Sequence, residues 1–293
     1  MNYLRDFYEQ LNQSENDRFA RWKEYRLALT SMILPYLTSS DSCFVGAVGN
    51  ADDIDLEQLN KATSNLTLAD IDEDAINRGV QKYHLDGEVK TLQTDFTNLS
   101  QTDLLEELYT TLILAKSKTD IDIYMEKFEE VFTSIEKSKS TLEYDVIILL
   151  PIYTQMLIPI FHQSYQALKE KGIDIHLLNY AFEEMMVVAS KSIDYLNKSL
   201  INQLKDNGTM ISISDIFEAD ITSPFYLKLS KDIHHPSKMD AHLKEYQNKF
   251  GYGAGDFGVE NLEEYLNPVT HQWLIWPFSE QAHFFVKLTI FKK

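Results

Sequence analysis

The sequence has only one cysteine, Cys43, among its 293 residues. An internal disulfide and a cysteine-based zinc site are therefore excluded, which suits a reducing cytoplasm. Hydrophobic runs long enough to cross a bilayer are also missing, since the most apolar stretch, 146–161, is short and interrupted by prolines. The first residues are polar and lack the apolar core of a signal peptide. We therefore expect a cytoplasmic protein with no membrane partner.

Basic residues are scarce relative to acidic ones. The chain has 27 Lys and Arg against 45 Asp and Glu, which gives a formal net charge of −18. Most of such a surface repels a phosphate backbone, and no cluster of Lys or Arg offsets it, so we expect no nucleic-acid partner. The histidines His234, His235 and His242 match no strong zinc spacing, and we expect no metal site. A small molecule is the expected ligand.

Glycines are few as well, and two short segments contain most of the informative ones. Gly251–Gly258, GYGAGDFG, matches the G-x-G-x-x-G fingerprint of dinucleotide-binding loops. Such a loop works only where it follows a strand and opens a helix. Here a helical pattern precedes it, no strand leads in, and a second acidic helix follows. We therefore predict a helix–loop–helix connection at this segment rather than a nucleotide site.

Hydrophobic periodicity predicts an α/β protein. The order strand, helix, strand, helix, strand near the start indicates a parallel sheet, and two late strands with a short connection indicate an antiparallel hairpin. We expect strands within 39–48, 65–72, 89–96, 143–153, 208–217, 271–278 and 283–293. Helical patterns cover 3–37, 72–84, 101–138, 155–170 and 176–205, and residues 218–268 are expected to be loop plus helix.

The earlier glycine segment, Cys43–Leu56, has the context that the later one lacks. CFVGAVGNADDIDL contains an apolar strand, a tight turn at Gly46 and Gly49, and then a helical pattern. Asp70 and Asp95 end the next two strands. Ligands of open α/β sheets bind at the carboxyl ends of the strands, and an acid at such a position can accept ribose hydroxyl groups. The alternative is that these acids only cap helices and turns.

The acidic character of this turn discriminates between cofactors. Asp52 and Asp53 would repel a pyrophosphate, whereas they would attract an ammonium or sulfonium group. S-adenosylmethionine has those two cations and no phosphate, so the residues themselves favour it over NAD.

Several segments together resemble the class I S-adenosylmethionine-dependent methyltransferases. They are the turn GAVGNADD, the acids of LADID and LQTDF, the strand YDVIILL and the terminal pair QWLIWPF and HFFVKLTIF. The turn GNADDIDL also resembles a bacterial subgroup, but has Asp52 where that pattern has Asn. The resemblance implies a Rossmann-like, mostly parallel seven-stranded sheet that ends in an antiparallel hairpin. It implies a helical cap at 1–38 and a methyltransferase domain at 39–293, with helical insertions near 98–140 and 218–268.

The resemblance also implies roles for particular residues. Asp70 would hold the ribose, Asp95 the adenine amino group, and Phe96 one adenine face. Tyr153 and Gln155, beyond the fourth strand, would contact the substrate, although Tyr153 is as readily a core residue. The implied S-adenosylmethionine site consists of Gly46, Ala47, Gly49, Asn50, Asp53, Asp70, Ile71, Asp95, Phe96 and Leu150.

We therefore predict a methyltransferase that acts on a small acceptor, with no catalytic residue assigned and the oligomeric state open. One alternative is a non-enzymatic protein that binds the cofactor or a partner on the same fold. A less favoured one is an NAD-dependent oxidoreductase. Arg21, Tyr25 and Arg26 in the N-terminal helical region either cover the cofactor or lie on the surface, and Trp273 and Trp276 are expected to pack in the core.

Overall fold

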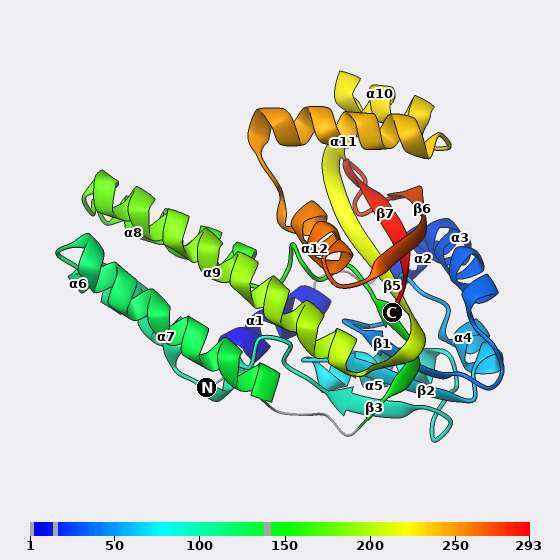
Figure 1. Ribbon diagram of the computed structural model, residues 1–293. Helices are drawn as coiled ribbons and strands as arrows, with labels where there is room; N and C mark the ends of the chain where they lie inside the picture. Colours follow the sequence, from blue (N-terminus) through cyan, green and yellow to red (C-terminus); the bar gives the residue numbers. More distant parts are fainter. Residues whose placement is uncertain (1–2, 14–16, 138–141) are drawn as a thin grey trace.

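A single seven-stranded sheet organises the protein (Figure 1). The computed structural model describes residues 3–13, 17–137 and 142–293. The strand order is β3-β2-β1-β4-β5-β7-β6, in which β1 to β5 pair in parallel and β7 pairs antiparallel with both β5 and β6. The strands are β1 (Ser42–Gly46), β2 (Asn65–Asp70), β3 (Lys90–Gln93), β4 (Tyr144–Leu149), β5 (Leu204–Asp220), β6 (Asn267–Trp276) and β7 (Ala282–Lys292). The predicted fold class, a mostly parallel sheet with a terminal hairpin, is confirmed.

The central strand β4 shows why the sequence folds this way. Its side chains alternate between two hydrophobic cores: Ile147 and Leu149 pack into one, Val146 and Ile148 into the other. A strand covered on both faces is expected to be almost continuously apolar, as this one is. β4 lies between β1 and β5, in the middle of the parallel part of the sheet.

Helices cover the two faces of the sheet in different ways. α3 (Lys23–Ile33), α4 (Leu56–Ala62) and α5 (Glu73–Lys82) contribute to the core that contains Val146. The opposite core, which contains Ile147, includes side chains of α1 (Tyr3–Gln13), α6 (Leu104–Leu114), α7 (Lys118–Lys137), α8 (Ile158–Glu170) and α9 (Ile175–Asn202). Short α2 (Arg18–Arg21) precedes α3, and 3-10 turns occupy Leu34–Tyr36 and Leu99–Gln101.

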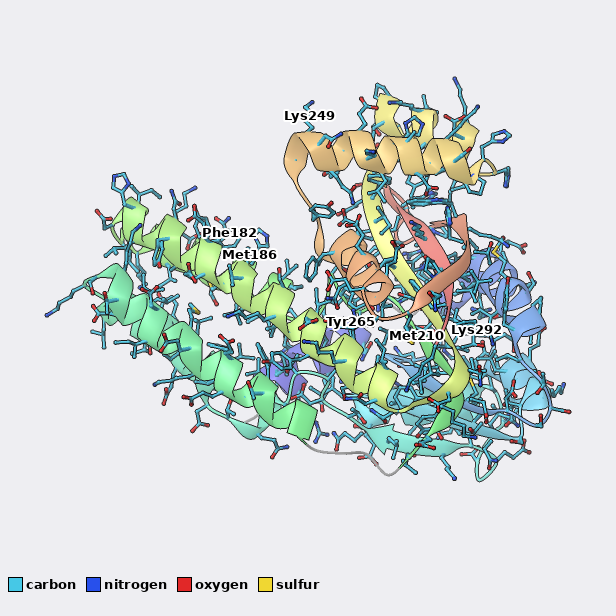
Figure 2. The ribbon with its side chains drawn as sticks, in the orientation of Figure 1. Phe182, Met186, Met210, Lys249, Tyr265 and Lys292 are labelled. Carbon is cyan, nitrogen blue, oxygen red and sulfur yellow. The ribbon has the colours of Figure 1, made fainter. Side chains whose placement is uncertain are left out.

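Helices α6 to α9 extend beyond the sheet as a helical arm (Figure 1). Within it, Phe182 of α9, labelled in Figure 2, packs against the rings of His162 and Tyr165 of α8 at 4.9 Å each. Lys191 of α9 forms an ion pair with Glu129 of α7. The region 101–138 was predicted to form one or two helices, and α6 and α7 agree with this.

The segment that precedes the terminal hairpin is helical. It contains α10 (Pro224–Asp232), α11 (Pro236–Phe250) and α12 (Ala254–Glu263), so the predicted mixture of loop and helix is confirmed. β5 is longer than its predicted range of 208–217 and includes a bulge near Ile216. Residues 1–2 and 14–16 of the predicted cap, and 138–140 of the predicted insertion, lie outside the described residues. The division into cap and domain stays a prediction. Among the described helices, none has the length and apolar character needed to cross a membrane.

Candidate functional site

A cavity of about 550 Å³ lies at the carboxyl ends of the parallel strands. This volume is within the range of roughly 300–1,000 Å³ that is usual for small-molecule sites. Each strand of the sheet, or the segment that follows it, supplies a residue to the cavity wall. From β3 to β6 these include Asp95, Asp70, Gly49, Gln155, Asp215, Phe284 and Trp276. Leu4, Phe7, Tyr8, Leu11, Asn12, Arg18 and Trp22 from the N-terminal region form a further part of the wall.

The turn after β1 has an unusual backbone. Ala47, Gly49 and Ala51 have φ values of 59°, 47° and 52°. This left-handed region costs a non-glycine residue roughly 1–2 kcal/mol. Strained residues of this kind are concentrated at ligand sites, where the surrounding structure holds them in place. Here the Gly49 amide donates to Asp70 Oδ2 at 2.8 Å, which joins the turn to the end of β2.

Gly46 has a packing role that the sequence did not reveal. A Cβ atom at Gly46 would lie 3.1 Å from the side chains of Phe44 and Leu149 and 3.2 Å from Phe96. Gly46 is buried and is not part of the cavity wall. Of the predicted cofactor residues, Leu150 is also in the core, with 1% exposure, and outside the wall. The structure brings the other eight to the wall: Ala47, Gly49, Asn50, Asp53, Asp70, Ile71, Asp95 and Phe96.

Asp70 is buried at the cavity. In the described part of the chain, its carboxylate accepts hydrogen bonds from backbone amides and from no cationic side chain. Its Oδ1 accepts from the Asp72 amide at 3.0 Å and its Oδ2 from the Gly49 amide. Burial raises the pKa of Asp70 to about 6, and the two backbone amides oppose that shift. A carboxylate offers about four acceptor sites, so acceptor capacity remains for hydroxyl groups of a ligand.

Asp95 combines a local structural role with a place in the wall. Its Oδ1 accepts from the amide and hydroxyl of Thr97 at 2.8 and 2.7 Å, and its Oδ2 accepts from the Ser100 amide at 2.7 Å. These bonds cap the short turn that follows β3. The capping alternative is thus correct for Asp95, and the same carboxylate also lines the cavity beside Phe96.

Asp52 and Asp53 differ in their surroundings although they are adjacent. Lys82 forms an ion pair with the Asp52 carboxylate, and Arg26 donates to the Asp52 carbonyl at 2.7 Å. Asp53 lines the same cavity, and burial raises its pKa to about 7. The nearby Asp52 raises it further, while Arg26 and Lys82 lower it. Asp53 is therefore an acid whose ionised form a bound cation would stabilise.

Tyr153 lies away from the cavity wall. Its side chain is 1% exposed, and its hydroxyl donates to Asn197 Oδ1 at 2.8 Å. Its ring lies against Gly258, where an added Cβ would approach within 2.4 Å. The predicted substrate contact at Tyr153 finds no support in this placement, which matches the core alternative. Gln155, the second predicted substrate residue, does line the cavity.

Asp215 is a site residue that the sequence reading missed. Thr154 donates to its Oδ2 at 2.6 Å, and within the described residues its buried Oδ1 has no hydrogen-bond partner. Burial raises the pKa of Asp215 to about 6. The bulge in β5 explains its setting: Asp215, Ile216 and Glu218 all line the cavity, which regular strand alternation would not allow. No pattern in the sequence marked this bulge.

Aromatic side chains form the wall beyond Asp215. Trp22 packs edge-on against Trp276 at 4.8 Å, and Phe278 lies 5.2 Å from Trp276 and 5.1 Å from Phe284. Trp276 was expected in the core, and it is both buried and part of the cavity wall. Within the described residues, its buried Nε1 has no hydrogen-bond partner, and neither has the hydroxyl of Tyr25, which stacks on its ring.

The N-terminal region is fastened over the cavity at both ends. The Tyr8 hydroxyl donates to the carbonyl groups of Gln155 and Met156. Asn12 accepts at its carbonyl from Asn50 at 2.9 Å. At the other end, Arg21 donates to the Phe278 carbonyl at 2.9 Å. Tyr25 and Arg26 are buried, so the surface alternative for these two residues is wrong.

The ionisable groups of the wall are strongly unbalanced. Within the residues that the structure describes, six carboxylates line it, those of Asp52, Asp53, Asp70, Asp95, Asp215 and Glu218, against one guanidinium, that of Arg18. Such a wall attracts cations and disfavours phosphate groups. Among the described residues, no three His, Cys, Asp or Glu side chains are arranged to hold a metal ion. His242 instead pairs with Asp232 at 3.0 Å.

The later glycine segment has a different setting. Its first three residues connect α11 to α12, so the predicted helix–loop–helix arrangement is confirmed, although α12 begins at Ala254, earlier than predicted. An added Cβ at Gly255 would lie 2.2 Å from the Asp215 carbonyl oxygen. The Gly255 carbonyl accepts from the Ser214 hydroxyl at 2.8 Å. Gly255 lets α12 pack closely on β5, and none of the four glycines of the segment lines the cavity.

Comparisons with known proteins give similarity in structure alone. No family model matches the chain, and no curated protein matches it in sequence. Among solved structures, the N-methyltransferase NodS from Bradyrhizobium japonicum WM9 is 15% identical with a TM-score of 0.44, covering 95% of this chain and 99% of that one. Geranyl diphosphate C-methyltransferase from Streptomyces coelicolor A3(2) is 8% identical with a TM-score of 0.44, covering 96% and 84%.

A third similar structure is a SAM-dependent methyltransferase from Methanosarcina mazei, 11% identical with a TM-score of 0.43, covering 89% of this chain and 96% of that one. The strand order and terminal hairpin of the chain themselves show the class I methyltransferase fold that the sequence resemblance predicts.

Proposed function

We propose that the protein binds S-adenosylmethionine and transfers its methyl group to a small acceptor. The observation that carries this proposal is the cavity at the strand ends, where a left-handed glycine turn and, in the described part of the chain, six carboxylates converge with one cationic side chain. A cofactor with a sulfonium and an ammonium group and no phosphate fits that wall. A dinucleotide with a pyrophosphate does not.

Each part of the cofactor finds complementary groups on the chain. The left-handed turn at Gly49 leaves backbone free of a side chain, so a ligand can approach closely. Asp70, held by the Gly49 amide, accepts the ribose hydroxyls. Asp53 attracts the ammonium group, and Asp95 and Phe96 are suited to the adenine amino group and ring. This distribution follows the order of strands from β3 to β1.

The chemistry that the cofactor supplies is displacement of a methyl group from sulfur. The chain contributes alignment of the acceptor and exclusion of water. Gln155 and Thr154 follow β4, next to Asp215 on β5, so the acceptor is expected at this end of the cavity. The N-terminal region, fastened by Tyr8 and Arg21, keeps water from the reacting groups.

Mass spectrometry of ligand retained by the purified protein tests the proposal. We expect release of S-adenosylmethionine, or of its demethylated product, from the denatured wild-type protein. Gly49→Val should retain neither, because the substituted side chain enters the space where backbone meets ligand. Repeated purification with added S-adenosylmethionine and no retention above the Gly49→Val background would refute the proposed cofactor.

A methyl-transfer assay separates an enzyme from a non-enzymatic binder. Formation of the demethylated product from added S-adenosylmethionine is measured with small acceptors present and absent. We expect acceptor-dependent product. Tight cofactor binding without such product for any acceptor class would favour a non-enzymatic protein on this fold.

A further inference from the structure

The cofactor accounts for only part of the acidic wall. Asp95, Asp70 and Asp53 lie at or after the ends of β3, β2 and β1, where the adenine, the ribose and the ammonium group, in that order, are expected. Asp215 and Glu218 belong to β5, which β4 separates from β1. Two carboxylates therefore remain at the end of the cavity where the acceptor is expected.

The Asp215 carboxylate is an incomplete polar group. Its Oδ2 accepts from Thr154, but its Oδ1 is buried and has no hydrogen-bond partner among the described residues. Leaving a buried carboxylate oxygen without a donor is costly, so native proteins rarely do so without a reason. A hydrogen-bond donor on a bound ligand would supply the partner that Oδ1 lacks. Asp215 belongs to the cavity wall, so a ligand in the cavity would lie next to this residue.

Aromatic rings line the same cavity as Asp215. Trp276, Phe278 and Phe284 also line the cavity, Phe284 of β7 is paired with Glu218 of β5, and the ring centroids of the three lie between 5.1 and 5.9 Å apart. Aromatic faces attract cations through the ring quadrupole, and most strongly in Trp. An acid with an open acceptor beside aromatic rings recognises an ammonium group with an apolar body.

Glu218 extends the negative charge towards solvent. It is exposed and also lines the cavity, so it lies where the cavity meets the surface. The bulge near Ile216 turns Asp215 and Glu218 towards the same space. A cation approaching from solvent therefore meets Glu218 first and the buried Asp215 next, which favours its entry over that of an anion.

We propose that the methyl acceptor is an aryl- or alkyl-amine, held between the Asp215 carboxylate and the aromatic wall of Trp276, Phe278 and Phe284. This inference rests on the proposed function, since it names the acceptor class of that same cavity. Asp215 accepts an N–H hydrogen bond at Oδ1, and the rings cover the apolar part of the amine.

The transfer balances for such an acceptor. The protonated amine first loses one proton to solvent. The nitrogen lone pair then forms the bond to the methyl carbon, and the electron pair of the broken carbon–sulfur bond stays on sulfur. The sulfonium becomes a neutral thioether, and the product leaves as a methylated ammonium ion. Asp215 orients the nitrogen through its hydrogen bond.

Calorimetric titration with matched probes tests the acceptor class in the presence of S-adenosylhomocysteine, so that no turnover occurs. Phenethylamine and a series of alkyl and aryl-alkyl amines are compared with the alcohols and carboxylic acids of the same skeletons. We expect amines to bind at least about tenfold more tightly than their alcohols, as bonds to charged groups are the stronger kind. Alcohols or acids that bind as tightly as the amines, or no binding by any probe, would overturn the proposal.

A pair of variants assigns the effect to Asp215. Asp215→Asn should weaken amine binding by at least about tenfold and leave alcohol binding within about twofold. Asp220→Asn, at the exposed end of the same strand, is the matched control and should retain amine binding. Equal amine affinity in Asp215→Asn and wild type would contradict the assignment. A separate titration with S-adenosylhomocysteine alone distinguishes this failure from failure of the cofactor proposal.

Discussion

The two glycine segments of this chain have similar letters and different surroundings. The segment 46–53 begins at the end of β1 and has three left-handed residues, of which Ala47 and Gly49 line the cavity. The segment 251–258 contains the short connection from α11 and the start of α12, and Gly255 and Gly258 lie against Asp215 and Tyr153. The segment 251–258, which matches the dinucleotide fingerprint better, thus serves packing, while the segment 46–53, which matches it less well, borders the candidate site. Context decides what a glycine does, because only a turn after a strand leaves its backbone open to a ligand.

The comparison predicts its largest effect at Gly49. A valine at φ 47° is strained and also places a branched side chain at the cavity, so Gly49→Val should weaken S-adenosylmethionine binding by more than about 100-fold. Calorimetric titration measures this. Gly87→Val introduces similar strain at φ 78° where nothing lies within 4 Å. That control should lose stability and keep its affinity. Equal loss of affinity in both variants would show that strain, and not the cavity, is responsible.

The next largest effect is expected at Asp70. Removal of a carboxylate that accepts ribose hydroxyls and also holds the Gly49 amide should cost about 1.5–3 kcal/mol of binding free energy. Asp70→Ala should therefore bind S-adenosylmethionine roughly tenfold to a hundredfold more weakly in titration. A folded Asp70→Ala protein, verified by circular dichroism, with wild-type affinity would exclude the ribose role.

A substitution in the segment 251–258 should lower the stability of the fold rather than the affinity for the cofactor. The added Cβ of Gly255→Ala meets the Asp215 carbonyl oxygen, so α12 must move away from β5. Overpacking of this kind costs about 1–3 kcal/mol of the free energy of unfolding. Denaturant unfolding measures it, and cofactor affinity should stay within a few fold of wild type. Gly253→Ala, whose Cβ meets only the Asp256 carboxylate at 3.1 Å, is the milder control. A large loss of affinity without loss of stability in Gly255→Ala would reverse the assignment of the two segments.

A smaller effect concerns the pH dependence of stability in the ligand-free protein. The pKa of Asp53 is raised from 3.8 to about 7, so between these pH values the folded state binds more protons than the unfolded state. Its contribution therefore becomes unfavourable as pH rises from about 4 to 7, and the full cost is present above pH 7. Asp53→Asn removes that cost, so its free energy of unfolding should exceed that of wild type at pH 8 but not at pH 4.

Thermal unfolding at the two pH values checks this expectation. Asp206→Asn, at an exposed position outside the cavity wall, should follow the wild-type profile. If Asp53→Asn gained the same stability at both pH values, ionisation of Asp53 would not be what destabilises the folded protein.

The comparison also shows how far the sequence reaches. The mostly parallel sheet with its terminal hairpin was predictable from the hydrophobic patterns. So were the wall positions of Gly49, Asp70 and Asp95, because these residues lie at or just after the ends of predicted strands. Asp215 was not predictable, since it lies inside a strand and reaches the cavity through a bulge that depends on pairing with β7.

For a related reason, the predicted substrate contact at Tyr153 finds no support. Tyr153 follows β4 at the expected place, but its direction is set by Asn197 and Gly258, which are 44 or more residues away in sequence. Gly46 was assigned to the cofactor from its position in the turn, whereas its closest neighbours are Phe44, Leu149 and Phe96. Local pattern predicts which strand end a residue occupies. Tertiary contacts decide whether its side chain faces a ligand.

Parallel calorimetric titrations of the wild-type protein with S-adenosylmethionine and with NAD test the central claim most directly. The acid-lined cavity beside the first glycine turn predicts binding of S-adenosylmethionine, loss of that binding in Gly49→Val, and no measurable binding of NAD. Binding of NAD with an affinity equal to or above that of S-adenosylmethionine, or retention of full S-adenosylmethionine affinity in Gly49→Val, would contradict it.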